Sequence, residues 1–193
     1  MLTIATTILG IPGAVFWLWF SAFFYAIAII FFWNPLRKER TELMYAFFAF
    51  LLGMASFHIL LGFGFFWNNH WLIHLGSFAA LTGSAFTLKF PLTALKSETA
   101  KKFLFYTALA VAWLIIAWLI VFPHETKTML WLVLGYMIII AGGISGFYMV
   151  WKGLQIKETG LKLKCVGGGS AVITCCFVAD LMLLLIGMSV LGE

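Results

Sequence analysis

The chain carries very little charge for its length. Only 10% of its 193 residues are Asp, Glu, Lys or Arg, whereas about a quarter are charged in an average soluble domain. Apolar residues make up 64%, so there is too little polar surface for a soluble globular domain or a disordered chain. Cysteine is scarce as well, at three residues, which excludes a disulfide-rich scaffold. The class that remains is a polytopic membrane protein.

Long apolar runs fill almost the whole sequence. A transmembrane helix needs about 20 mostly apolar residues, and six stretches satisfy this length. Because the runs are continuous and do not alternate, they predict helices and not barrel strands. We therefore expect an all-α bundle of six transmembrane helices that forms a single membrane domain over 1–193. The predicted spans are 8–33, 43–66, 71–90, 103–122, 129–151 and 166–191.

Basic residues are concentrated in three of the five loops. The first, third and fifth loops with their flanks hold 11 of the 12 Lys and Arg residues, whereas the fourth loop holds only Lys127. In a six-span chain these three loops share one side, and the positive-inside rule predicts that this side is cytoplasmic. Both termini are then extracytoplasmic, in a cell membrane. The formal charge of +5 follows from topology and requires no nucleic-acid partner.

The three basic loops also resemble one another. They contain Lys38-Glu39-Arg40-Thr41, Lys96-Ser97-Glu98-Thr99 and Lys157-Glu158-Thr159. A bundle of three helical hairpins joined by tight outer turns gives this pattern. The alternative is that short basic loops use few residue types and therefore resemble one another without a repeat. Internal repeats are common in transporters.

All four histidines fall in the outer half of the predicted topology. His58 lies within the second span, His70 and His74 begin the third, and His124 lies in the fourth loop. His70 and His74 share a helix face because they are four residues apart. The second and third spans are joined by a very short turn, so they are antiparallel neighbours.

This arrangement predicts a histidine site near the extracytoplasmic face. His58 and His74 at similar depth fit the two axial ligands of a b-type haem. A compact set of His58, His70 and His74 fits copper or zinc instead. The alternative is that His70 and His124 are ordinary interface or loop residues, and that His58 donates a hydrogen bond to a neighbouring helix.

Asp180 is the only aspartate, and it lies near the middle of the sixth span. An aspartate at that depth costs about 2.5–3.5 kcal/mol on insertion scales, so it is a candidate functional residue. It fits three roles: orienting a ligating imidazole, serving as one station of a proton path, or bonding in neutral form to a Ser or Thr of a neighbouring helix.

Three functions follow from these residues. The first is a redox subunit that holds haem b, or a metal, and exchanges electrons with a quinone or a partner protein. The second is a non-catalytic structural or sensor subunit that packs against other membrane subunits. The third is a proton-coupled transporter that uses Asp180. In none of them is the chain a self-sufficient enzyme, because no nucleophile and base coincide in depth.

Overall fold

Six of the helices are long and apolar enough to cross a membrane. The structure is a computed structural model that describes residues 7–8, 11–38, 40–122 and 126–190. The described residues are helical except for short connections and one pair of two-residue strands. The predicted fold class, an all-α bundle with six membrane spans, is confirmed.

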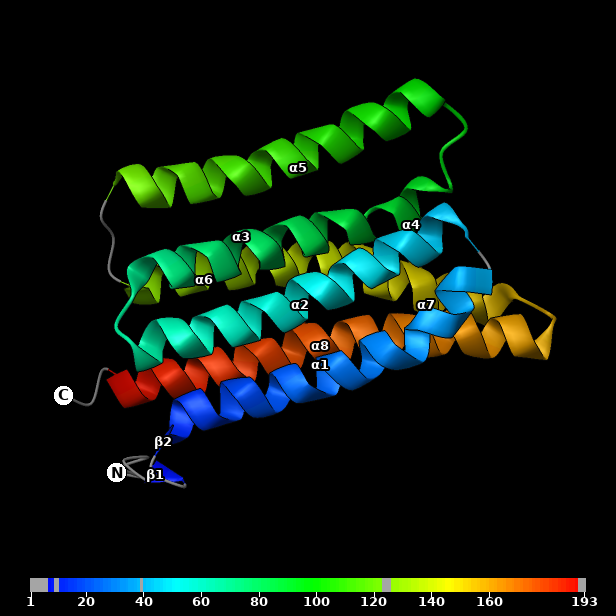
Figure 1. The fold of residues 1–193 in the computed structure, drawn as a ribbon. Helices are drawn as coiled ribbons and strands as arrows, with labels where there is room; N and C mark the ends of the chain where they lie inside the picture. Colours follow the sequence, from blue (N-terminus) through cyan, green and yellow to red (C-terminus); the bar gives the residue numbers. More distant parts are fainter. Residues whose placement is uncertain (1–6, 9–10, 39, 123–125, 191–193) are drawn as a thin grey trace.

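The chain runs from two short strands through helices that alternate in direction (Figure 1). Strands β1 (Thr7–Ile8) and β2 (Ile11–Pro12) pair antiparallel. Four spans are formed by α1, α2, α5 and α8, the third by α3 with α4, and the fifth by α6, η1 and α7. The bounds are α1 Gly13–Lys38, α2 Glu42–Phe66, α3 His70–Thr87, α4 Lys89–Leu92, α5 Glu98–Val121, α6 Thr126–Met137, η1 Ile138–Gly146, α7 Phe147–Gln155 and α8 Thr159–Val190.

Helix ends are set by local capping. The Thr41 hydroxyl accepts the Met44 N–H at 3.3 Å at the start of α2, and the Ser97 hydroxyl accepts the Ala100 N–H at 3.3 Å at the start of α5. These hydroxyls satisfy N–H groups that have no partner within the helix. As a result α5 begins five residues before the predicted span. Helix α1 instead begins at Gly13 and not at residue 8, because Ile11 and Pro12 directly before it form strand β2.

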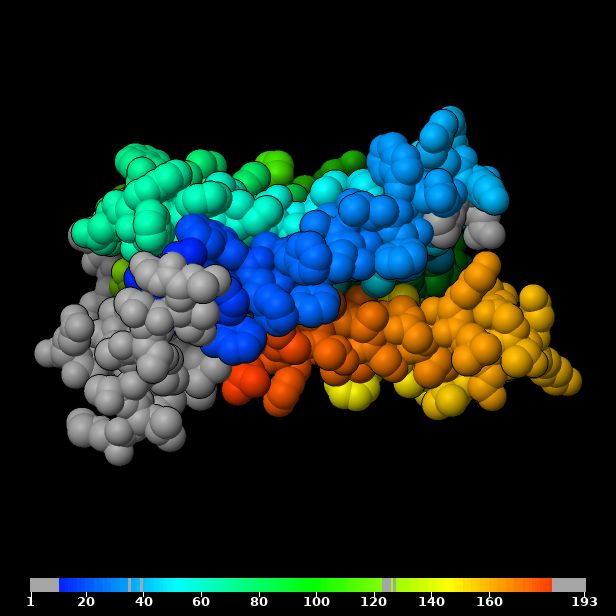
Figure 2. Space-filling model, turned by 60° about the horizontal axis from the view of Figure 1, so that its bottom comes forward, coloured from blue at the N-terminus to red at the C-terminus, as the bar shows by residue number. Residues whose placement is uncertain are grey.

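The centre of the bundle is the pair of helices α2 and α3. A Cβ placed on Gly53 would lie 2.6 Å from the Ala79 carbonyl oxygen, and one on Gly83 would lie 3.1 Å from the Ala49 carbonyl oxygen. The two backbones therefore approach as closely as glycine allows, as small residues permit in membranes. Helices α1, α5 and the η1 region pack around this pair. Figure 2 shows α1 lying between α2 and α8 on one face.

The three basic connections lie at one end of the bundle, as the alternation of helices requires. Figure 1 places the α1–α2, α4–α5 and α7–α8 connections together, and the α2–α3 turn at the opposite end. We call these the basic end and the histidine end. Helix α1 begins, and α8 ends, at the histidine end.

Large apolar side chains cover the outside of the bundle. On α5 only Ala112, Ile116 and Leu119 are buried, while Phe103 and Leu114 are more than 60% exposed. In water such a surface would aggregate, whereas in a bilayer it is the expected lipid-facing surface. The fold therefore agrees with a multi-pass membrane protein.

Candidate functional site

His58 is completely buried in the middle of α2. Its Nδ1 lies 2.8 Å from the Met54 carbonyl oxygen, one turn earlier. A carbonyl oxygen only accepts, so Nδ1 carries the proton and Nε2 carries the lone pair. Nε2 is buried and has no hydrogen-bond partner within the described part of the chain. An unsatisfied buried polar atom costs about 1–3 kcal/mol, so His58 is an unusual residue for a bundle core.

The His58 ring lies between α1 and α2. Its centroid is 5.0 Å from the ring centroid of Tyr25 on α1 and 5.3 Å from that of Phe57. The Tyr25 hydroxyl in turn donates to the Cys175 carbonyl oxygen of α8 at 3.4 Å. His58 therefore belongs to a buried seam where α1, α2 and α8 meet.

His70 and His74 lie at the start of α3, at the histidine end. Asn69 caps this helix, since its side-chain oxygen accepts the N–H groups of Trp71 and Leu72 at 3.0 and 3.4 Å. Asn68 has a φ of 49°, the left-handed conformation that asparagine tolerates better than most residues. The tight turn and the cap together determine where α3 begins, and the start of the helix determines the positions of His70 and His74.

The two imidazoles line one cavity of about 230 Å³. Its other walls come from α5, through Leu119 and Ile120, and from α6, through Thr126 and Met129. His74 Nδ1 is a buried atom without a hydrogen-bond partner among the described residues. The cavity therefore combines apolar walls with two imidazoles one helical turn apart.

The structure brings His70 and His74 together but gives His58 different neighbours. His58 packs against Tyr25 of α1, whereas His74 lines the cavity beside α5 and α6. Within the residues that the structure describes, no group of three or more His, Cys, Asp or Glu side chains could hold a metal ion. The predicted three-histidine set is thus not assembled here. His124 lies outside the described residues.

Asp180 is half-buried on α8, and its Oδ1 atom is buried without a hydrogen-bond partner in the described part of the chain. It follows Cys176 by one turn, so the two residues share a helix face. Cys176 Sγ lies 3.8 Å from the Met137 carbonyl oxygen, and a Cβ placed on Gly142 would lie 3.4 Å from Cys176 Cβ. Asp180 therefore lies on the face that α8 turns toward the fifth span, on a different seam from His58.

The fifth span contains a feature that the sequence reading missed, a nine-residue π-helix, η1. The Ser145 hydroxyl donates to the Ile140 carbonyl oxygen at 2.8 Å, five residues earlier. Thr87 Oγ1 lies 3.0 Å from Ser145 Oγ and 2.6 Å from the Ser84 carbonyl oxygen. π-Helical turns are rare and are often found at functional sites.

One signal for this region was present in the sequence. Ser77, Ser84 and Thr87 recur on one face of the third span at intervals of seven and three residues, and all three are fully buried. The spacing of Gly142 and Gly146 is typical of close helix packing, but it does not indicate a π-helix over Ile138–Gly146. Comparisons of the chain with protein-family models, curated proteins and solved structures found no match.

Proposed function

We propose that the chain is a cell-membrane protein that binds a copper or zinc ion through His70 and His74 at the histidine end of the bundle. The observation that carries the proposal is the shared cavity that His70 and His74 line, together with a His74 Nδ1 atom that has no protein partner among the described residues. Imidazole is a preferred ligand of both metals. Two histidines one helical turn apart can bind the same ion.

Two protein ligands leave coordination positions open. A structural zinc site is closed by four protein ligands, whereas a catalytic or transfer site keeps a position for water or substrate. The open positions here would be filled by water or by a ligand from another membrane subunit. This supports the view that the chain works within a larger assembly, on the side opposite the basic loops, which the positive-inside rule makes extracytoplasmic.

A metal ion is favoured over haem b by the surroundings of the two predicted axial ligands. A bis-histidine haem requires two imidazoles that face each other across the macrocycle. Here the His58 ring packs against Tyr25 of α1 at an interplanar angle of 36°, whereas His74 lines the cavity beside α5 and α6. The cavity of about 230 Å³ is also below the range of about 300–1,000 Å³ typical of organic ligand sites. Haem-linked electron transfer to a quinone stays a prediction.

The π-helix favours a second candidate function, proton-coupled transport through Asp180. Transporters place ion sites near the membrane midplane beside helices with irregular backbone. Asp180 has an unpartnered carboxylate oxygen within the described residues, on the face of α8 that carries Cys176 against Gly142 of η1. An aspartate beside an irregular helix in the membrane can carry a proton.

Copper binding to the purified protein in detergent tests the metal proposal. We expect one saturable Cu²⁺ site whose electron paramagnetic resonance spectrum shows coupling to imidazole nitrogen. The double variant His70→Gln/His74→Gln should weaken binding at least about tenfold, because it removes both ligands. Thr126→Ala changes the same cavity wall without removing an imidazole, so it should bind like the unaltered protein.

Equal binding by the unaltered protein and the double variant would overturn the metal site. Optical spectra of the same samples separate the haem alternative. A haem absorption band that disappears in both His58→Gln and His74→Gln would replace the metal proposal with the bis-histidine haem.

A further inference from the structure

A second cavity lies at the basic end, among α2, α4 and α5. It has a volume of about 340 Å³ and is lined by the first turns of α2 and α5, by α4, and by apolar and aromatic side chains. Its charged walls are Lys89, Lys101, Lys102, Glu42 and Glu98. We call it the lysine pocket. With both carboxylates ionised it has one excess positive charge, and its volume falls within the usual range of ligand sites.

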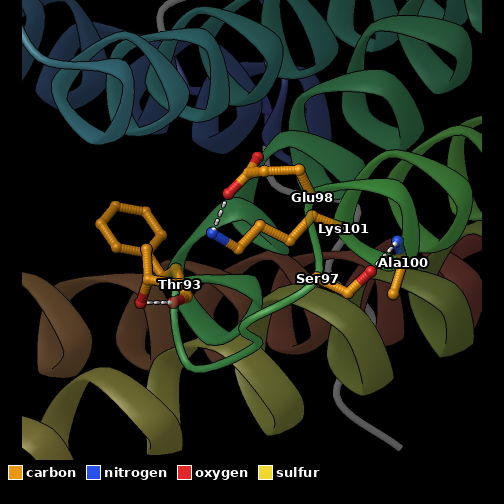
Figure 3. A network of polar contacts seen from close by, with 6 residues as sticks. Thr93, Ser97, Glu98, Ala100 and Lys101 are labelled. Carbon is orange, nitrogen blue, oxygen red and sulfur yellow. Dashed lines mark hydrogen bonds and ion pairs between the residues drawn. The ribbon is translucent and has the colours of Figure 1, made fainter.

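Two of the lysines are held in the pocket by glutamates that remain in solvent. Lys89 pairs with Glu42, and Lys101 pairs with Glu98 at 2.5 Å; Figure 3 shows the second pair in the first turn of α5. The lysine side chains are 23% and 28% exposed, whereas their carboxylate partners are 75% and 73% exposed. Such exposed ion pairs contribute little to stability, so an incoming anion can displace the carboxylates at low cost.

Aromatic rings fix the position of one ammonium group. Lys89 Nζ lies 4.9 Å from the ring centroid of Phe105 and 5.9 Å from that of Phe86. These cation–π contacts hold the ammonium at the pocket before any ligand arrives. Lys102 also lines the pocket and makes no ion pair within the described residues, so its charge is free to bind an anion.

The position of the lysine pocket points to lipid as the source of that anion. The pocket lies where α2 and α5 begin and α4 ends, which are the ends of three candidate spans. The lining residue Tyr106 and its neighbour Phe103 are 61% and 69% exposed on α5, and exposed aromatic side chains at span ends mark the level of the lipid head groups. Apolar α5 surface continues from there along the bundle.

We propose that the lysine pocket binds the phosphate head group of an anionic phospholipid, whose acyl chains run along the exposed face of α5. Lys89, Lys101 and Lys102 contact the phosphate, while Glu42 and Glu98 turn outward into solvent. A basic cluster at a span end is the arrangement that attracts anionic lipids. The site is independent of the histidine cavity, which lies at the other end of the bundle.

Lipid binding to the purified protein in detergent tests this proposal. A short-chain phosphatidylglycerol should raise the thermal unfolding temperature in a saturable manner, and phosphatidylcholine of the same chain length should not. Lys89→Gln/Lys101→Gln/Lys102→Gln should weaken phosphatidylglycerol binding at least about tenfold, since each lysine near a lipid surface contributes to the attraction. Glu42→Gln/Glu98→Gln should strengthen binding several-fold, because it removes the competing carboxylates.

A matched control uses the α7–α8 connection at the same end. Lys152→Gln/Lys157→Gln/Lys162→Gln removes the same charge outside the pocket and should leave phosphatidylglycerol binding within about twofold. Equal losses of phosphatidylglycerol binding in the two triple variants would overturn the proposed site, because the lipid would then bind to the basic end through its overall charge. Stabilisation by inorganic phosphate as large as that by phosphatidylglycerol would overturn lipid as the source. Unchanged binding in the glutamate variant would contradict the displacement of the carboxylates.

Discussion

Single ring nitrogens determine what the histidines of this chain can bind. In His58 the Nδ1–H group donates to the Met54 carbonyl oxygen, so Nε2 is the only ring nitrogen left for a ligand or a proton. In His74 the buried, unpartnered atom is Nδ1. The Nδ1 atoms of the two residues therefore differ, because that of His58 donates to a backbone carbonyl oxygen and that of His74 has no partner among the described residues.

Asp180 gives a test of the transport candidate at the scale of one residue. Asp180→Asn keeps the size of the side chain but cannot carry a proton. If the chain moves protons, proteoliposomes should acidify in response to an imposed gradient, and Asp180→Asn should reduce the rate at least about tenfold. A pH-sensitive dye inside the vesicles measures that rate.

Asp180→Glu is the matched control, because it restores a carboxyl group and should recover part of the flux. Equal proton flux in the Asn variant and the unaltered protein would exclude Asp180 from the path.

Close helix contact is the dominant interaction at the scale of elements. The α2–α3 pair depends on Gly53 and Gly83, where added Cβ atoms would meet backbone atoms at 2.6 and 3.1 Å. Backbone cannot rotate away as a side chain can. By contrast, a Cβ on Gly135 of α6 meets nothing within 4 Å.

The two kinds of glycine should respond to substitution in opposite directions. Gly53→Ala forces α2 and α3 apart and should destabilise the fold by about 1–3 kcal/mol. Gly135→Ala adds a methyl group in open space and should stabilise it by up to about 1 kcal/mol, because alanine favours helix. Unfolding followed by tryptophan fluorescence in a denaturing detergent measures both. A Gly53→Ala variant as stable as Gly135→Ala would contradict the close approach.

At the scale of the whole molecule, the two ends of the bundle differ in charge. The positive-inside rule predicts that the basic end is cytoplasmic. In a variant whose three native cysteines are replaced, the substitution Trp67→Cys places a thiol in the α2–α3 turn. This thiol should react with a membrane-impermeant reagent on intact cells. The thiol introduced by Lys96→Cys, at the basic end, should react only after the cells are permeabilised. The reverse pattern would invert the predicted topology.

The fold was predictable from the sequence because span position depends on local hydropathy. The six apolar runs and the basic loops can be identified without knowledge of how the helices pack. Hydropathy alone did not predict the exact helix ends, because the hydroxyl caps of Thr41 and Ser97 extend α2 and α5 beyond the apolar runs. Strand β2, directly before Gly13, could not be predicted from an apolar run.

The candidate sites were predictable only in part, because sequence spacing does not determine how one helix is rotated against another. The pair of His70 and His74 lies within a single helix turn, and the spacing predicted it. The relation of His58 to His74 depends on the rotation of α2 and α3. The η1 region depends on a contact between Ser145 and Thr87, 58 residues apart, and the lysine pocket depends on three helices meeting.

The burial pattern of α5 has a consequence for how this sequence can vary over evolutionary time. Its three buried residues, Ala112, Ile116 and Leu119, form one narrow stripe at spacings of four and three. Between Tyr106 and Leu119, outside both cavities, selection on the other residues of the helix acts mainly on apolarity and length, so most apolar exchanges there are neutral. Related chains should therefore diverge fastest in this lipid-facing part of α5 and slowest in α2 and α3, and a search for distant homologues should give weight to that helical pair.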